Sequence, residues 1–237
     1  MKIVDKYYNE LWNSHNTHHN NSKSSEEGML LRMLHKVFNP LLNDRHTVAK
    51  RIIAGLSGKL LDIGCWGGKS LQLMGAFEQF EELYGVDIIK ESVESARQIG
   101  IKATQCNLNE EPLPFDDNYF NVVTCLAVIG QIFDPYFVVK EIHRVLKING
   151  ILILNVPNVA SLPNRIRLLL GRLPVTSRGP GWDGGQLHYF TQYDTINFLT
   201  NAGFKVDEVK TTGNGTILRQ LSPSLLSGTL TFKARKK

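Results

Sequence analysis

Short apolar segments alternate with amphipathic segments between residues 58 and 157, and this alternation limits the fold more than any other feature of the chain. Apolar runs of about four to eight residues predict buried strands, and apolar residues at helical spacing predict helices. Strands and helices in alternation form a mostly parallel sheet with right-handed crossovers. Strands are predicted over 59–63, 82–87, 101–106, 119–127 and 151–156, and helices over 70–80, 91–99 and from 135 onward.

The residues beyond Pro157 are predicted to add a short helix, a long loop rich in Gly and Pro, a last helix and two strands. A capping box, Thr191-Gln-Tyr-Asp194, marks the start of the last helix. The fold class expected is therefore α/β, with a doubly wound, mostly parallel sheet of seven strands. The elements predicted beyond Pro157 are a helix over 164–170, a loop over 171–185, a helix over 192–202, and strands over 204–209 and 229–234. The domain division expected is a helical N-terminal cap at 1–57 and a main domain at 58–237 with an insertion at 159–187.

The segment most informative about chemistry is Leu60-Leu-Asp-Ile-Gly-Cys-Trp-Gly-Gly68, in which an apolar strand runs into an acid and then glycines. Glycines let the chain turn sharply and let a ligand approach the backbone. The carboxyl ends of strands are where ligands bind in open α/β sheets. The next strand ends in Asp87, whose carboxylate can accept both hydroxyl hydrogens of a ribose. These features predict a cofactor that contains adenosine.

A dinucleotide-binding fold is the nearest alternative. It requires glycines in the pattern G-x-G-x-x-G, and Gly64, Gly67 and Gly68 do not supply that spacing. Asp62 would also repel a pyrophosphate, whereas it suits a cation or an ammonium group. An NAD-dependent oxidoreductase is therefore disfavoured.

The order and spacing of nine segments resemble the class I S-adenosylmethionine-dependent methyltransferases, especially the small-molecule branch called type 11. The resemblance extends over about residues 58–209. The segments are Asp62-Ile-Gly-Cys-Trp-Gly-Gly68, Asp87, Cys106-Asn107-Leu108, Leu113-Pro-Phe-Asp116, Phe120-Asn-Val-Val-Thr124, Glu141 to Gly150, Val156-Pro-Asn158, His188-Tyr-Phe-Thr191 and Ala202-Gly-Phe204.

The resemblance implies a Rossmann-like methyltransferase fold, S-adenosyl-L-methionine as cofactor, and ten cofactor-binding residues. Three of these residues also have purely structural interpretations: Asp62 as a cap, Asp87 as a helix N-cap and Asn107 as a turn residue. The implied roles place Asp62, Gly64, Cys65 and Gly68 at the methionine part, Asp87 at the ribose, Ile88, Asn107 and Leu108 at the adenine, and Leu126 and Ala127 near the sulfonium.

Three departures from the family pattern are visible. Trp66 replaces the usual middle glycine, so its side chain must point away from the cofactor or shape the rim of the pocket. Asn107 replaces a common Asp, although its amide oxygen can still accept from an adenine amino group. Residues 128–134 lack the Glu or His pair of many relatives, which puts a base at that position in doubt. His188 is then the best candidate for a catalytic base, against a structural role at a helix entry.

The charge distribution limits the classes of molecule that this protein is expected to bind. The net charge of +5 comes mainly from residues 233–237 and from arginines within 161–182. No aromatic residues interleave with these arginines, so binding of nucleic acid is disfavoured. The arginines indicate either a solvated loop or a site for an anionic group of the acceptor.

The three cysteines have no metal-like spacing and suggest buried thiols in a reducing cytoplasm. No metal is expected, although His15, His18 and His19 offer an alternative, and no apolar run is long enough to span a membrane. The sequence does not indicate the oligomeric state.

We therefore expect a cytoplasmic methyltransferase that moves a methyl group to a small-molecule acceptor by in-line displacement. The alternative is a protein that binds the cofactor, does not catalyse, and acts through a partner. Residues Tyr7, Tyr8 and Trp12 resemble the segment that covers the cofactor in relatives.

Overall fold

The computed structural model describes residues 44–176, 186–212 and 220–237. The interpretations that concern Tyr7, Tyr8, Trp12 and the histidines at 15, 18 and 19 lie outside these residues. Within them the elements are α3 (Asp44–Ile53), β1 (Lys59–Ile63), α4 (Lys69–Met74), β2 (Glu82–Asp87), α5 (Lys90–Gln98), β3 (Lys102–Gln105), β4 (Phe120–Leu126), α6 (Pro135–Val145), β5 (Leu146–Pro157), α7 (Leu162–Leu169), α8 (Gln192–Asn201), β6 (Phe204–Thr211), α10 (Pro223–Leu226) and β7 (Thr229–Lys236).

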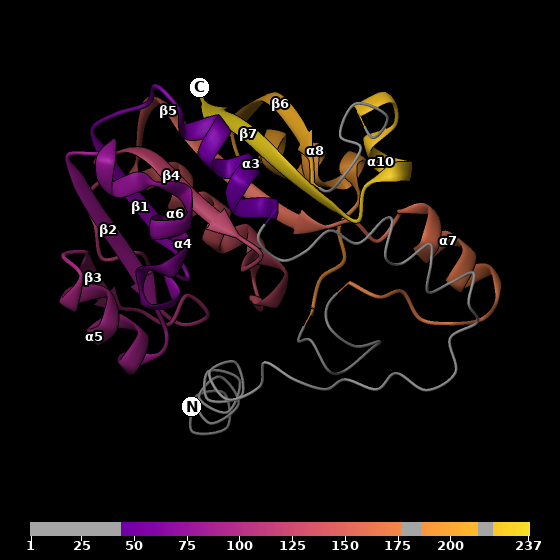
Figure 1. Ribbon diagram of the computed structural model, residues 1–237, viewed down its shortest axis with the longest axis horizontal. Coiled ribbons are helices and arrows are strands. Elements are labelled where there is room, and N and C mark those ends of the chain that lie inside the picture. Colours follow the sequence, from indigo (N-terminus) through magenta and orange to yellow (C-terminus); the bar gives the residue numbers. More distant parts are fainter. Residues whose placement is uncertain (1–43, 177–185, 213–219) are drawn as a thin grey trace.

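The sheet has seven strands in the order β3-β2-β1-β4-β5-β7-β6 (Figure 1). The first five strands pair in parallel, and β7 runs antiparallel to both β5 and β6. This confirms the predicted α/β, doubly wound, mostly parallel sheet. The strand order reverses between β1 and β4, and such a reversal is where open α/β sheets bind ligands.

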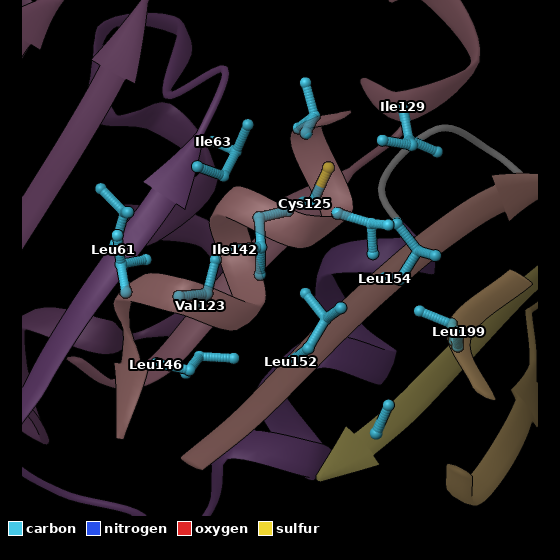
Figure 2. Packing of buried hydrophobic residues seen from close by; sticks show 14 of the residues in the cluster. Leu61, Ile63, Val123, Cys125, Ile129, Ile142, Leu146, Leu152, Leu154 and Leu199 are labelled. Carbon is cyan, nitrogen blue, oxygen red and sulfur yellow. The ribbon is translucent and has the colours of Figure 1, made fainter. Parts of the chain in front are cut away.

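Two buried clusters of apolar side chains cover the two faces of the sheet. Successive residues of a strand point to opposite faces, so Leu60 packs with α3, α4 and α5, whereas Leu61 packs with α6 and α8. Figure 2 shows the second cluster, in which side chains of β1, β4 and β5 meet Ile142 of α6. The parallel strands are apolar on both faces because helices cover both.

The helix starts follow from local sequence. The Asp134 carboxylate accepts the N–H of Phe137 at 3.0 Å, and a proline follows it at the first helical position of α6. The Thr191 hydroxyl likewise accepts the N–H of Asp194 at 3.2 Å and opens α8, as predicted. The predicted helix 70–80 is shorter in the structure because Gly75 adopts φ +68 and ends α4.

Candidate active site

The described residues enclose a cavity of about 150 Å³ at the carboxyl ends of β1, β2, β3 and β4. That volume is below the roughly 300–1,000 Å³ of a complete ligand pocket, and it suits one end of a larger molecule. The lining comes from the last residues of β2 and the two after it, and from residues that follow β1, β3 and β4. The lining residues are Gly64, Val86, Asp87, Ile88, Ile89, Cys106, Asn107, Leu108, Asn109, Val128, Gln131 and Ile132.

Asp87, the last residue of β2, presents its carboxylate to this cavity. Its Oδ2 accepts the N–H of Trp66 at 2.9 Å and the hydroxyl of Ser92 at 2.8 Å, while Oδ1 accepts the N–H of Ile89 at 3.0 Å. Burial raises the pKa of the carboxyl. A carboxylate has about four acceptor positions, so one remains for a ligand hydroxyl and the rotatable Ser92 hydroxyl can vacate another. Asp87 therefore ties the glycine loop to the start of α5, where Ile89 is the N-cap without a side-chain cap, and it also occupies a position suited to a diol.

The glycine loop turns between β1 and α4, and only one of its predicted residues lines the cavity. Gly64 has φ +70, and a Cβ there would lie 2.6 Å from the Val128 side chain. Cys65 is fully buried in the core against Gly85, and a Cβ on Gly68 would meet Ile101 at 2.4 Å. Cys65 and Gly68 thus pack toward the sheet and α5 and do not line the cavity.

Trp66 occupies the third position of this loop with φ +43. A left-handed conformation costs a residue with a Cβ about 1–2 kcal/mol, so the loop holds local strain at Trp66. The ammonium of Lys69 lies 5.1 Å from the centroid of the indole ring. The ring does not line the cavity formed by the described residues. The side chain therefore leaves the cavity open, as the sequence requires of a cofactor site.

Asp62, the next-to-last residue of β1, is almost completely buried. Thr124 of β4 donates its hydroxyl to Oδ1 at 2.6 Å, whereas Oδ2 has no hydrogen-bond partner among the described residues. Burial raises the pKa of this carboxyl to about 7, and the charge of Arg45 opposes the rise. A buried acceptor without a hydrogen-bond partner, such as Asp62 Oδ2, destabilises the folded state. A cationic group bound beside it would remove this destabilisation.

Arg45 of α3 is a residue that sequence reasoning missed, and its charge acts on Asp62, although neither of the two lines the cavity. Its Nε is buried and has no partner among the described residues, and burial lowers the pKa of the guanidinium. The charge of Asp62 opposes that lowering. An unpaired donor and an unpaired acceptor of opposite charge fit the carboxylate and ammonium groups of an amino acid. Sequence reasoning missed Arg45 because its position near β1 depends on tertiary contacts, namely the packing of α3 against α4, β5 and β7.

The predicted adenine residues do meet at the cavity. Ile88 and Leu108 line it from the ends of β2 and β3, and Asn107 lies between Cys106 and Leu108. The Asn107 Oδ1 accepts the N–H of Asn109 at 3.1 Å, which is the turn role considered as an alternative. An amide oxygen has two lone pairs, so this turn leaves one for an adenine amino group.

The predicted sulfonium residues, Leu126 and Ala127, are not among the residues that line the cavity. Leu126 is buried with the α3, α4 and α5 cluster, and the N–H of Ala127 donates to the Asn155 carbonyl at 3.0 Å. The cavity is instead lined after β4 by Val128, Gln131 and Ile132. These residues were not predicted, because a Gln among apolar residues carries no pattern that distinguishes it from a loop.

His188 lies beside the segment that follows β4. The Gly130 carbonyl accepts the N–H groups of Leu187 and His188, at 2.7 and 3.1 Å. The Nε2 of His188 lies 3.2 Å from the Phe133 carbonyl oxygen. A carbonyl oxygen only accepts, so Nε2 carries the hydrogen and the lone pair resides on Nδ1. His188 does not line the cavity itself, but Phe133 directly follows the lining residue Ile132.

The predicted basic stretch is divided by the structure. Arg165 and Arg172 are exposed, whereas Arg167 is buried and donates from Nε to the Leu173 carbonyl at 2.8 Å. Arg178 lies outside the described residues. The three cysteines are free and buried.

Comparisons with known proteins agree with this geometry. Residues 61–154 match the family model of a methyltransferase domain. A ubiquinone biosynthesis O-methyltransferase of Idiomarina loihiensis is 35% identical over 107 residues, which cover 40% of this chain and 41% of that protein. The chain thus spans less than half the length of this curated relative. A solved structure of a possible histamine N-methyltransferase from Thermotoga maritima aligns over 100% of this chain and 99% of that chain, with a TM-score of 0.62 and 16% identity.

These findings define the class: residues 61–154 match a methyltransferase domain, and the fold is that of solved S-adenosylmethionine-dependent methyltransferases. S-adenosylmethionine is the cofactor of these methyltransferases. The fold alone does not fix the reaction, since the solved structure of the cyclase SpnF aligns over 92% of this chain and 84% of that chain, with a TM-score of 0.56 and 17% identity.

A glycine substitution tests the shape of the loop. We expect Gly64→Ala to lower the free energy of unfolding by about 2–4 kcal/mol, from left-handed strain and from overlap with Val128. Gly100→Ala is the matched control, because Gly100 has φ +89 and nothing lies within 4 Å of its Cβ position. Chemical denaturation measures both. Equal losses in the two variants would show that Val128 does not crowd the loop.

Proposed function

We propose that the protein binds S-adenosylmethionine at this cavity and moves its methyl group to a small-molecule acceptor by in-line displacement. The observation that carries the proposal is the pair of carboxylates on neighbouring strands, of which Asp62 is buried and Asp87 is half-buried. Asp87 faces the cavity with acceptor capacity for a diol, and Asp62 keeps an unpaired buried oxygen for an ammonium group. A dinucleotide would instead place phosphates near Asp62, where two negative charges would repel each other.

The residues can hold each part of the cofactor. Ile88 and Leu108 would pack on the adenine, Asp87 would accept the ribose hydroxyls, and Asp62 with Arg45 would pair with the amino-acid end. The cofactor supplies a methyl group activated by a positively charged sulfur. The protein contributes alignment, and orientation of this kind can supply about 7–11 kcal/mol of the barrier.

The acceptor that we favour carries a hydroxyl group. The curated relative is named as an O-methyltransferase, and a hydroxyl must lose its proton as its oxygen attacks the methyl carbon. We infer that the Nδ1 of His188 takes this proton, since the Phe133 carbonyl holds the hydrogen on Nε2. The exposed Arg165 and Arg172 would suit an acceptor with an anionic group.

A non-catalytic protein that binds the cofactor and acts through a partner is the second candidate. The observation that favours it is the lining after β4, where Val128, Gln131 and Ile132 include no acid or histidine. An active enzyme would then depend on His188, which lies just outside the cavity lining.

Two measurements decide between these functions. Calorimetry with S-adenosylhomocysteine and with NAD tests the cofactor, and we expect binding of the first only. Release of S-adenosylhomocysteine with a panel of phenols, hydroxylated lipids and sugars tests catalysis. Binding without release on any member of a broad panel would favour the non-catalytic protein, and binding of NAD alone would refute the proposal.

We also propose a cytoplasmic location, which the three buried free thiols support. The division into a cap at 1–57 and a domain at 58–237 with an insertion at 159–187 stays a prediction. Val48 and Ile52 of α3 share a core cluster with Leu60, so this part of the cap is joined closely to the domain.

A histidine variant tests the base. We expect His188→Asn to lower kcat by about 10²–10⁴, the usual contribution of proton transfer, and to leave the affinity for S-adenosylhomocysteine unchanged. His143→Asn is the control, because the His143 ring packs on Phe204, with centroids 5.1 Å apart. Stopped-time assays of methyl transfer measure kcat. Full turnover by His188→Asn would remove His188 from the mechanism.

A further inference from the structure

Helix α7 buries polar side chains and exposes apolar ones, which is the reverse of an ordinary surface helix. Its polar residues Asn164 and Arg167 are buried, whereas Leu168 and Leu169 are 53% and 86% exposed. Surface helices of globular proteins bury their apolar stripe and expose their polar one. Figure 1 shows α7 beyond the ends of β5 and β7, away from the body of the sheet.

The orientation is fixed by polar contacts on the inner side. The Asn164 Oδ1 accepts the N–H of Val175 at 3.0 Å, and the Arg167 Nε donates to the Leu173 carbonyl at 2.8 Å. Both contacts tie the helix to the segment that returns after it. Rotation of α7 to bury its leucines would break these bonds and expose their partners. The leucines are therefore held outward.

The outward leucines form a tip, which we call the leucine tip and define as Leu168, Leu169, Leu170 and Leu173. Leu170 and Leu173 are both 58% exposed. Three consecutive helical residues spread over roughly 200° around the axis at 3.6 residues per turn. A protein groove takes a narrow row of residues spaced three or four apart. The leucine tip is too broad for such a groove and suits a fluid apolar phase.

The charged residues around the leucine tip indicate which kind of apolar surface it can bind. Arg165 and Arg172 are exposed on either side of it, and residues 158–176 contain no Asp or Glu. Apolar side chains flanked by arginines are typical of elements that lie in the boundary of an anionic bilayer. No helix among the described residues has both the length and the apolar character that a membrane crossing requires.

We propose that α7 docks this protein on the surface of an anionic lipid bilayer, with the leucine tip inserted among the acyl chains and Arg165 and Arg172 at the headgroup phosphates. Docking needs no catalysis, so it is independent of methyl transfer. A variant with weakened cofactor binding, such as Asp87→Ala, would still bind vesicles. Failure of the docking and failure of the proposed function are therefore distinguishable.

Flotation of the full chain with vesicles tests the proposal. We expect binding to vesicles of phosphatidylcholine with phosphatidylglycerol, weaker binding to phosphatidylcholine alone, and loss of binding as salt is raised. Leu169→Ser/Leu170→Ser should weaken binding at least tenfold, and Arg165→Gln/Arg172→Gln by about fivefold for each arginine. Ile148→Ser is the matched control, since Ile148 is 61% exposed at the start of β5, whereas α7 follows its end. The side chains replaced in these variants are all exposed, so the thermal unfolding temperature should not change.

Three outcomes would overturn the proposal. The first is no binding to anionic vesicles, and the second is unchanged binding by the leucine variant. The third is a dimer in vesicle-free solution that Leu169→Ser/Leu170→Ser converts to a monomer, because a second copy would then cover the leucine tip.

Discussion

Asp87→Ala is expected to weaken the binding of S-adenosylhomocysteine by about 10²–10⁴-fold. Hydrogen bonds to a charged group contribute roughly 1.5–3 kcal/mol each, and the variant would lose two bonds to the ribose. It would also leave the N–H of Trp66 and the hydroxyl of Ser92 without their acceptor. The glycine loop would then lose its link to β2, which adds to the loss of affinity.

Titration calorimetry measures this change. Asp116→Ala is the matched control, because Asp116 is an exposed carboxylate outside the lining of the cavity. Ser92→Ala separates the two effects, since it removes one donor to Asp87 and keeps the carboxylate. A folded Asp87→Ala protein whose affinity is within threefold of the parent would refute the ribose assignment.

Asp62 should make cofactor binding depend on pH. Burial raises the pKa of this carboxyl to about 7, so the empty protein carries it largely protonated below neutrality. The ammonium group of the ligand pairs with the ionised form. We therefore expect the affinity for S-adenosylhomocysteine to rise about tenfold between pH 6 and pH 8. Asp62→Asn should bind weakly and show no such rise, and a parallel rise in both proteins would assign the pH dependence to another group.

The same carboxyl should affect the stability of the empty protein in the opposite direction. Its pKa in the unfolded chain is near 3.8, so between about pH 4 and pH 7 the folded state holds more protons than the unfolded state. Stability contributed by Asp62 is therefore lost as pH rises through that window. Asp62→Asn should be more stable than the parent by about 2 kcal/mol at pH 8, after allowance for its unpaired amide, and similar to it at pH 4. Thermal unfolding at both pH values measures the difference.

The strands and the acids at their ends were predictable because these signals are local. β1 and β2 have the predicted bounds, since a strand buried on both faces is a continuous apolar run. Asp87 follows such a run, and its place in the cavity follows from the topology of the sheet. The break at Gly75 was harder to predict, because a glycine within a helical pattern can be tolerated or can end the helix.

The parts of the site that escaped prediction depend on contacts distant in the sequence. Arg45 precedes Asp62 by 17 residues, with more than two turns of α3 and a loop between them, and the packing of α3 places its charge where it acts on β1. Gln131 lines the cavity although nothing in its neighbours distinguishes it from a surface residue. The roles of the individual site residues stay predictions until the variants above are measured.

The position of β7 affects the order in which the protein can mature during synthesis. β6 lies at the edge of the sheet and pairs with β7, which is made later and inserts between β6 and β5. Nascent chains fold from the N-terminus onward, so the parallel half can form first, while β6 has to wait for its partner to emerge. Until then β5 presents an unpaired edge of the kind that promotes association between chains, and a pause in translation before Thr229 would prolong that exposure.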